Sequence, residues 1–191
     1  MVKYEVGGIY DTPKGKIKIL ARTPGKRFPD GKRRHPRIII EIVKTGTILN
    51  VQSGNIATGK FTDYMEPSVY GVGFIGSNIQ IPSRGTSIIR RIYDLWANML
   101  KRAYGGYKTS YKEISVDPRW HNFTNFLNTI QEVPNYEAWE ENSNFNLDKD
   151  IIRKGNKVYS KETCMFVPPL INQSDCAMRR WHGFNYPMLT D

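Results

Sequence analysis

The spacing of apolar residues changes at Thr86, and this change limits the folds that the chain can adopt. After Thr86, apolar residues recur every three to four positions, which is the period of a helix with one buried face. Before it, short apolar runs alternate with glycine and proline, which is typical of strands joined by turns. The sequence therefore predicts an α+β fold, with a β-rich module over residues 1–85 and a mixed module over residues 86–191.

The β-rich module contains three apolar runs, at residues 16–20, 37–43 and 47–51. Turn-forming pairs such as Thr45-Gly46 separate them. A Gly-rich passage near the end of this module contains a GxGxxG string, but Pro82 follows it where a dinucleotide site needs a helix. We therefore expect a turn-rich β segment there and no nucleotide site.

Two amphipathic helices are predicted in the second module. The first begins at Thr86 or Ser87, either of which can cap it, and stops at Gly105-Gly106. The second begins at Asp117-Pro118, an acidic N-cap followed by proline at the first helical position, and ends at Pro134. The aromatic residues of both helices fall at helical spacing, so we expect them to pack in the core rather than to stack on nucleic-acid bases.

Positive charge is concentrated in the first module. The chain has 28 Lys and Arg against 18 Asp and Glu, and residues 1–85 hold fourteen of the basic but only six of the acidic side chains. Between the first two apolar runs, residues 22–37 carry seven basic side chains and one acidic one, and proline and glycine break any helix there. We expect a long, mobile hairpin tip or loop that contacts phosphates, or otherwise a merely solvated loop. The candidate contacts are Lys26, Arg27, Lys32, Arg33, Arg34 and Arg37.

Composition argues against several other classes of protein. No apolar run reaches the ~20 residues of a membrane span, and the N-terminus has no export signal, so we expect no membrane partner and a place in the cytoplasm of the host cell. Cys164 and Cys176 are expected to be reduced, partly buried thiols, with Cys164 in a packing role. Two cysteines and three scattered histidines, including His121 and His182, lack the spacing of a structural zinc site.

The last informative segment predicts a β-hairpin followed by a helix. Residues 145–152 and 157–167 are extended runs that flank a Gly155-Asn156 turn, and Pro168-Pro169 can open a helix. Asp148 would lie on the first strand and Asn172 on the helix. Such a unit can bring a carboxylate and an amide oxygen to one hard cation, which favours Mg²⁺.

Three blocks of residues, in order, span about 80 positions that end at Asn172. The first is Tyr93, Trp96, Met99, Arg102 and Tyr104; the second is Trp120, Phe123 and Phe126; the third is Leu147, Asp148, Lys149, Asp150, Gly155, Asn156, Tyr159, Ser160, Thr163, Cys164, Phe166, Val167, Pro168, Ile171 and Asn172. This series resembles that of phage-encoded HNH endonucleases of the homing type, which belong to the His-Me finger or ββα-metal class.

The resemblance implies a metal-dependent nuclease that cuts or nicks double-stranded DNA with Mg²⁺ or Mn²⁺. Asp148 matches the metal-binding Asp of that class, and Asn172 matches its helix Asn. Lys149 stands where the class has the histidine that activates water. A protonated lysine cannot take a proton from water, so Lys149 would serve as a base only if burial lowers its pKa. Otherwise Lys149 holds the scissile phosphate and Asp150, or a metal-bound hydroxide, supplies the base.

Further basic residues are candidates for contact with DNA. Arg102 lies on the first predicted helix and can reach either phosphate or the acidic spacer before the hairpin. Arg179 and Arg180 begin a terminal run in which cations and aromatic residues alternate, which favours nucleic-acid binding or a docked tail.

The replaced histidine leaves two alternatives to the nuclease. One is a DNA-binding protein that keeps the scaffold without the reaction, and the other is a phage structural or host-takeover protein that binds another protein.

Overall fold

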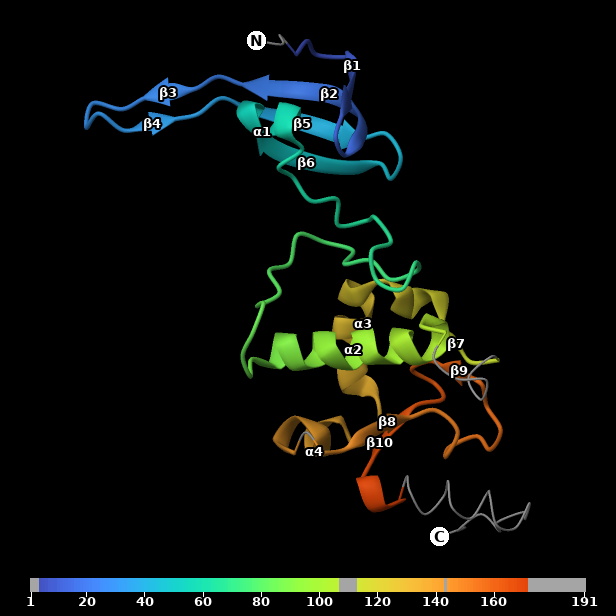
Figure 1. Cartoon of the computed structure of the whole chain (residues 1–191). Helices are drawn as coiled ribbons and strands as arrows, with labels where there is room; N and C mark the ends of the chain where they lie inside the picture. The colour runs from blue at the N-terminus through green and yellow to red at the C-terminus, as the bar shows by residue number, and fades with distance from the viewer. Residues whose placement is uncertain (1–3, 107–112, 143, 172–191) are drawn as a thin grey trace. The chain divides into compact units, whose positions relative to one another are not determined.

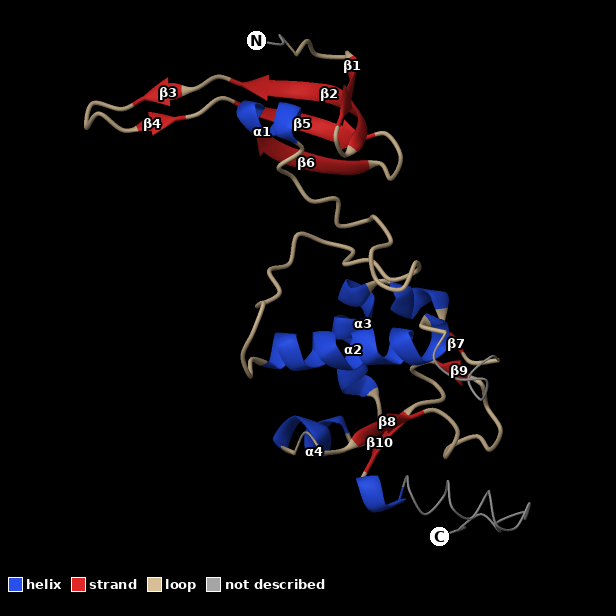
Figure 2. Ribbon diagram, in the orientation of Figure 1, coloured by secondary structure: helices blue, strands red, loops and turns tan. Residues whose placement is uncertain are grey.

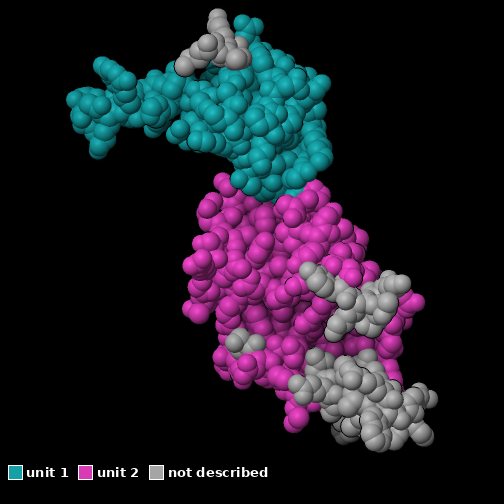
Figure 3. All heavy atoms as spheres, viewed as in Figure 1, with its two compact units in different colours: residues 1–66 teal, residues 67–191 magenta. Residues whose placement is uncertain are grey.

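The computed structural model describes residues 4–106, 113–142 and 144–171. Its helices and strands confirm the α+β class. The chain forms two compact units, Met1–Glu66 and Pro67–Asp191 (Figure 3). The division therefore comes before the Gly-rich passage, whereas the sequence indicated a boundary near residue 85. Within the described residues, no helix is long and apolar enough to cross a membrane.

The first unit is built on a four-stranded antiparallel sheet in the order β1-β2-β5-β6 (Figure 1). These strands are β1 (Ile9–Thr12), β2 (Gly15–Thr23), β5 (Arg37–Ile42) and β6 (Thr47–Gln52), and the short helix α1 (Ser53–Thr58) follows them. Alternate residues of a strand point to one face, so Ile38, Ile40 and Ile42 of β5 are all buried. They share a core with the following residues: Tyr4, Ile17, Ile19, Val51, Ile56 and Phe61.

The basic segment of this unit is an extension of the β2–β5 hairpin. Its two arms, β3 (Lys26–Arg27) and β4 (Arg33–Arg34), pair antiparallel beyond the sheet, and we call residues 26–34 the basic ribbon (Figure 2). At its tip, the Phe28 N–H donates to the Lys32 carbonyl over 2.9 Å, and Gly31 takes a φ of +82° that only glycine adopts without strain. The predicted hairpin tip is therefore present, and its arms are hydrogen-bonded to each other.

The second unit surrounds one long helix, α2 (Ile88–Tyr104). The Ser87 hydroxyl accepts from the Arg90 N–H at its start and Gly105 ends it, as the sequence predicted. Trp96 is fully buried, and its indole N–H donates to the Trp120 carbonyl over 2.7 Å. The fully buried residues packed in this core also include Leu100, Phe123, Phe126, Ile130, Cys164 and Phe166.

The second predicted helix is wrong as one continuous element. The chain forms a 3₁₀ turn at Pro118–His121, the helix α3 (Phe123–Thr129) and a second 3₁₀ turn at Ile130–Glu132. Asn122, between the first 3₁₀ turn and α3, is extended. Its neighbours are paired with Phe74, since the Phe74 N–H donates to the His121 carbonyl and the Phe74 carbonyl accepts from the Phe123 N–H. The Gly-rich passage thus forms hydrogen bonds on both sides of Asn122, and these bonds interrupt the helix.

The predicted hairpin is also wrong in its pairing. The strands β8 (Asn146–Asp148) and β10 (Met165–Val167) pair antiparallel, but Gly155-Asn156 does not join them directly. Between β8 and β10 the chain forms a further strand, β9 (Val158–Tyr159), which pairs parallel with β7 (Ser115–Val116). Pro169 to Ile171, which follow β10, are helical. A further helix, α4 (Tyr136–Glu141), precedes β8.

The close approach of the Gly-rich passage to α2 gives a first prediction. A Cβ on Gly73 would overlap the Leu100 side chain and lie 2.9 Å from Cζ2 of Trp96. We expect Gly73→Ala to lower the free energy of unfolding of the second unit by about 1–3 kcal/mol, as overpacked cores do. Urea unfolding followed by tryptophan fluorescence measures it, because all four tryptophans of the chain belong to this unit.

A double-mutant cycle provides the control. Leu100→Ala removes the atom that the new Cβ meets most closely, so Gly73→Ala should cost less in that background. An equal cost in both backgrounds would show that overlap with Leu100 is not the cause.

Candidate functional site

Three charged residues meet where β8 ends. Asp148 is the last residue of β8, and its Oδ1 accepts the backbone N–H groups of Asp150 at 2.8 Å and Ile151 at 2.9 Å. These two bonds turn the chain sharply after the strand. Lys149 and Asp150 are thereby held beside Asp148, and we call these three residues the β8 cluster.

The carboxyl groups of Asp148 and Asp150 lie close to each other. Burial raises the pKa of the Asp148 carboxyl above its usual range, and the neighbouring carboxyl of Asp150 raises it further. The backbone N–H groups of Asp150 and Ile151 oppose that shift by bonding to the charged form. Two adjacent carboxyl groups, partly withdrawn from water, are the oxygen donors that Mg²⁺ or Mn²⁺ prefers, so this donor pair fits such an ion.

The positive charge of Lys149 is balanced within the cluster by the carboxyl group of Asp150. Its residue is only 8% exposed, and its Nζ lies 3.4 Å from Oδ2 of Asp150 and 5.6 Å from the centre of the Tyr159 ring. The Asn156 side chain holds the Lys149 carbonyl through a 2.7 Å hydrogen bond. Lys149 is therefore fixed on both its backbone and its ammonium group, which suits a positioned charge.

Tyr159 links the cluster to Arg102. Burial raises the pKa of the Tyr159 hydroxyl, and the guanidinium of Arg102 beside it lowers that pKa. Arg102, expected to contact either phosphate or the acidic spacer, thus lies beside the hydroxyl of the same ring over which the Lys149 ammonium group sits. Tyr159 had no predicted role beyond its place in the motif, because its partners Lys149 and Arg102 come from two other segments of the chain.

Other predicted site residues fall outside the described part of the chain. Asn172 directly follows the last described residue, and Arg179, Arg180, Cys176 and His182 also lie beyond it. Among the described residues, no group of three or more His, Cys, Asp or Glu side chains is placed to hold a metal ion. Of the two predicted metal ligands, the described part of the chain therefore contains Asp148, and the carboxyl group of Asp150 lies beside it.

His121 has a structural role. Its Nε2 lies 3.0 Å from the Tyr104 hydroxyl, and the two rings pack edge to face. Burial lowers the pKa of the imidazole, which favours the neutral form.

Cys164 is fully buried behind β10, and this gives a second prediction. Burial raises the pKa of its thiol to about 12, while an exposed cysteine has a pKa of about 8.5. In a Cys176→Ser variant at pH 8, we expect iodoacetamide to alkylate Cys164 roughly 10³-fold more slowly than a free thiol, because only the thiolate reacts. Mass spectrometry follows the modification. Unfolding in urea should restore rapid alkylation, and fast reaction of the native protein would contradict the packing role.

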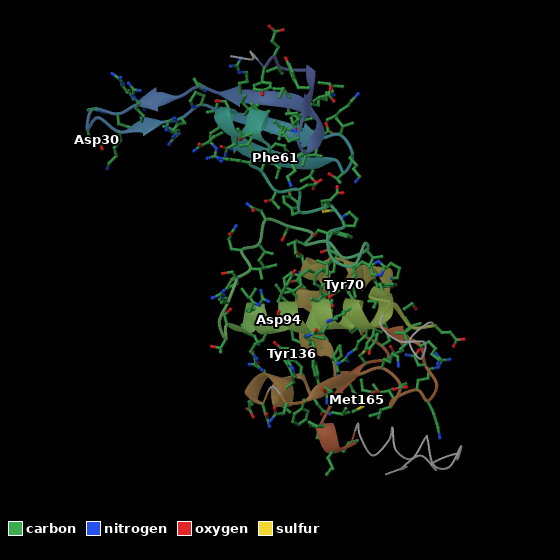
Figure 4. All side chains as sticks on the ribbon, in the orientation of Figure 1. Asp30, Phe61, Tyr70, Asp94, Tyr136 and Met165 are labelled. Carbon is green, nitrogen blue, oxygen red and sulfur yellow. The ribbon has the colours of Figure 1, made fainter. Side chains whose placement is uncertain are left out.

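The basic ribbon presents different side chains on its two faces. Lys26 pairs with Arg34 in the register, and both stand over the Phe28 ring, at 5.4 and 5.9 Å from its centre. Arg27 pairs with Arg33 and therefore points to the opposite face. All four cations are exposed. Asp30, at the tip in Figure 4, forms an exposed ion pair with Lys32 at 3.3 Å.

Arg37 differs from the other basic residues of the segment. Its Nε donates to Oδ1 of Asn50 over 2.9 Å, and its Nη2 donates to the Asn50 carbonyl over 2.6 Å. These bonds join β5 to β6 at the base of the ribbon, so Arg37 orders the sheet from which the ribbon extends.

The chain was compared with models of protein families, with curated proteins and with solved structures. No family model matches it, and no curated protein and no solved structure is significantly similar to it. The assignment of function therefore depends on the residues and geometry of the chain.

Proposed function

We propose that this protein is a metal-dependent DNA endonuclease of the HNH type, which a phage encodes and which hydrolyses phosphodiester bonds in double-stranded DNA. The observation that carries the proposal is the β8 cluster, in which two adjacent carboxyl groups stand at the end of β8. The antiparallel pairing of β8 with β10, followed by the helical residues Pro169 to Ile171, supports the same class. Its place of action is the cytoplasm of the infected cell.

In this mechanism the chain positions a phosphodiester rather than reacting with it. A bound Mg²⁺ or Mn²⁺ would be held by Asp148 and Asp150, with Asn172 as a further oxygen ligand, and would polarise the phosphate and lower the pKa of a water molecule. Lys149 provides a fixed positive charge beside these carboxyl groups, which favours the charge that develops on the phosphate. The hydrogen bonds from the backbone N–H groups of Asp150 and Ile151 keep the Asp148 carboxylate in one orientation.

DNA binding is assigned to the basic ribbon. A two-stranded β-ribbon has the width that the major groove of B-DNA admits, and four exposed cations on two faces can contact phosphates on both sides of a groove. Arg179 and Arg180 are proposed to add phosphate contacts from the C-terminal segment.

The test is conversion of supercoiled plasmid to nicked or linear DNA. Purified protein should cut with Mg²⁺ or Mn²⁺ and stop when EDTA is added. Absence of cutting over a range of sequences and both metals would refute the nuclease.

A second function is favoured by the position of Lys149. Because its ammonium group is paired with Asp150 where the HNH class has a water-activating histidine, the fold also suits a DNA-binding protein without cleavage. That protein would bind duplex DNA with strong salt dependence and with equal affinity in Mg²⁺ and EDTA.

A further inference from the structure

A groove runs along one face of α2 directly beside the β8 cluster. It encloses about 260 Å³, close to the lower end of the ~300–1,000 Å³ range of small-molecule sites. One wall is a helical stripe of α2, on which Asp94 is labelled in Figure 4. The lining residues from α2 are Arg91, Asp94, Leu95, Asn98, Met99 and Arg102, and those from the other wall are Trp139, Phe145, Asn146, Leu147 and Tyr159.

The groove and the cluster share two structural elements. β8 contributes Asn146 and Leu147 to the groove and Asp148 to the cluster. Tyr159 lines the groove, and Lys149 stands over its ring. Leu147 of the groove is therefore the immediate neighbour along β8 of Asp148 of the cluster.

The charges around the groove favour an anion. Arg91 and Arg102 stand about 16 Å apart along the helix, at 1.5 Å per residue. The one carboxylate of the lining, Asp94, is paired with Arg90 through a 3.0 Å bond from Nε to Oδ2. Arg91 is held at one end by donating to the carbonyls of Trp139 and Glu140, each at 2.8 Å, and its Nε is buried with no acceptor among the described residues. Arg102, at the other end, is exposed, and its guanidinium lies beside the Tyr159 hydroxyl.

The middle of the groove combines a flat apolar surface with amide groups. Leu147 and Met99 are buried below it, and Phe145 is half-buried. The side-chain amides of Asn98 and Asn146 make no hydrogen bond within the part of the chain that the structure describes. A nucleobase has this complementary character, because its faces are apolar and its edges pair with amide groups.

We propose that this groove binds one unstacked nucleotide of a DNA strand, with a phosphate at Arg102 and the base between Asn98 and Asn146. This inference rests on the proposed function, since it places the nucleotide next to the phosphodiester that the β8 cluster cuts. It assigns Arg102, a candidate phosphate contact from the sequence, to a defined site, and it adds Asn98 and Asn146 to that site. Enzymes that modify a base bind the extrahelical nucleotide in a pocket that forms hydrogen bonds to the edge of the base.

The test compares two variants at neighbouring positions. Arg102→Gln and Lys101→Gln each remove one positive charge from the last turn of α2, but only Arg102 lines the groove. Affinity is measured by fluorescence anisotropy in EDTA, on a duplex with a short single-stranded gap. We expect Arg102→Gln to weaken binding about tenfold, as loss of a charge-assisted hydrogen bond does, and Lys101→Gln to weaken it less than twofold.

A cross-linking measurement locates the base. The same DNA carrying 5-iododeoxyuridine in the gap should cross-link under ultraviolet light to the peptide that contains Phe145, and Asn98→Glu should suppress this cross-link by placing a like charge in the groove. A free deoxynucleoside monophosphate should compete only at much higher concentration than the DNA. Competition at equal concentration would show that the groove binds free nucleotides, and it would overturn the proposal that the groove binds a nucleotide within a DNA strand.

The outcomes separate this inference from the nuclease itself. Equal effects of Arg102→Gln and Lys101→Gln, or no cross-link near Phe145, would overturn the nucleotide site even if the plasmid is cut. Selective loss with Arg102→Gln, together with the cross-link, would support the site even if no plasmid is cut under any condition.

Discussion

Asp148→Asn is expected to abolish most of the metal-dependent cleavage while leaving the fold intact. The asparagine keeps an oxygen that accepts the backbone N–H groups of Asp150 and Ile151, so the turn after β8 is retained. What it loses is the negative charge that binds the cation. Because metal polarisation stabilises a transition state by several kcal/mol, we expect the cleavage rate to fall by about 10²–10³-fold.

The measurement is the initial rate of plasmid nicking with saturating Mg²⁺. Its matched control is Glu113→Gln, which removes a carboxylate from an exposed ion pair with Lys157 outside the cluster and should leave the rate unchanged. Circular dichroism and DNA affinity in EDTA should be the same for all three proteins. If Asp148→Asn cuts as fast as the wild type, the carboxylate does not bind the catalytic metal.

Neutralising the basic ribbon is expected to remove most of the affinity for duplex DNA. The variant replaces Lys26, Arg27, Arg33 and Arg34 with Gln, all of which are exposed. Each phosphate contact contributes about 0.9 to the slope of log affinity against log salt, so four lost contacts should reduce that slope by roughly 3–4. The same relation, if the charge effect vanishes near 1 M salt, gives an affinity loss of about 10³–10⁴-fold at 0.1 M.

Anisotropy titrations at several salt concentrations measure both quantities. The control removes two exposed cations of the first unit outside the ribbon, as Lys14→Gln with Lys60→Gln, and should change the slope by less than 1. Replacing only Arg27 and Arg33, or only Lys26 and Arg34, tests whether the two faces contribute alike. An unchanged slope in the fourfold variant would exclude the ribbon as the DNA contact.

Local patterns predicted much of the fold. The apolar run at residues 37–43, bounded by turn residues, predicted β5, and Ser87 with Gly105 predicted the limits of α2, because these signals act within one element. The turn residues of the basic segment likewise predicted a hairpin tip. In the same way, the side chain of Asp117 accepts from Arg119 N–H at the start of the 3₁₀ turn, as its place before Pro118 indicated.

The errors arose where a partner lies far away in the sequence. Asn122 sits in a helical pattern, and only the pairing of its neighbours with Phe74 interrupts the helix. Gly155-Asn156 has the composition of a two-residue hairpin turn, but β9 gains hydrogen bonds with β7 and β8 gains them with β10. In the sequence, Arg37 looks like another DNA-contacting cation. Its structural role comes from two hydrogen bonds to Asn50, which form only because β5 and β6 pair in this register.

The change of apolar period at Thr86 and the charge of the basic segment are properties of the sequence by itself. They determined the α+β class, the long helix and the basic hairpin, because each depends on residues close together in the chain. Only the tertiary structure decided the division after Glu66, the ion pair of Lys149 with Asp150 over Tyr159, and the groove between α2 and β8. Burial and charge compensation of this kind require segments that are distant in sequence to pack together, and no local pattern specifies that packing.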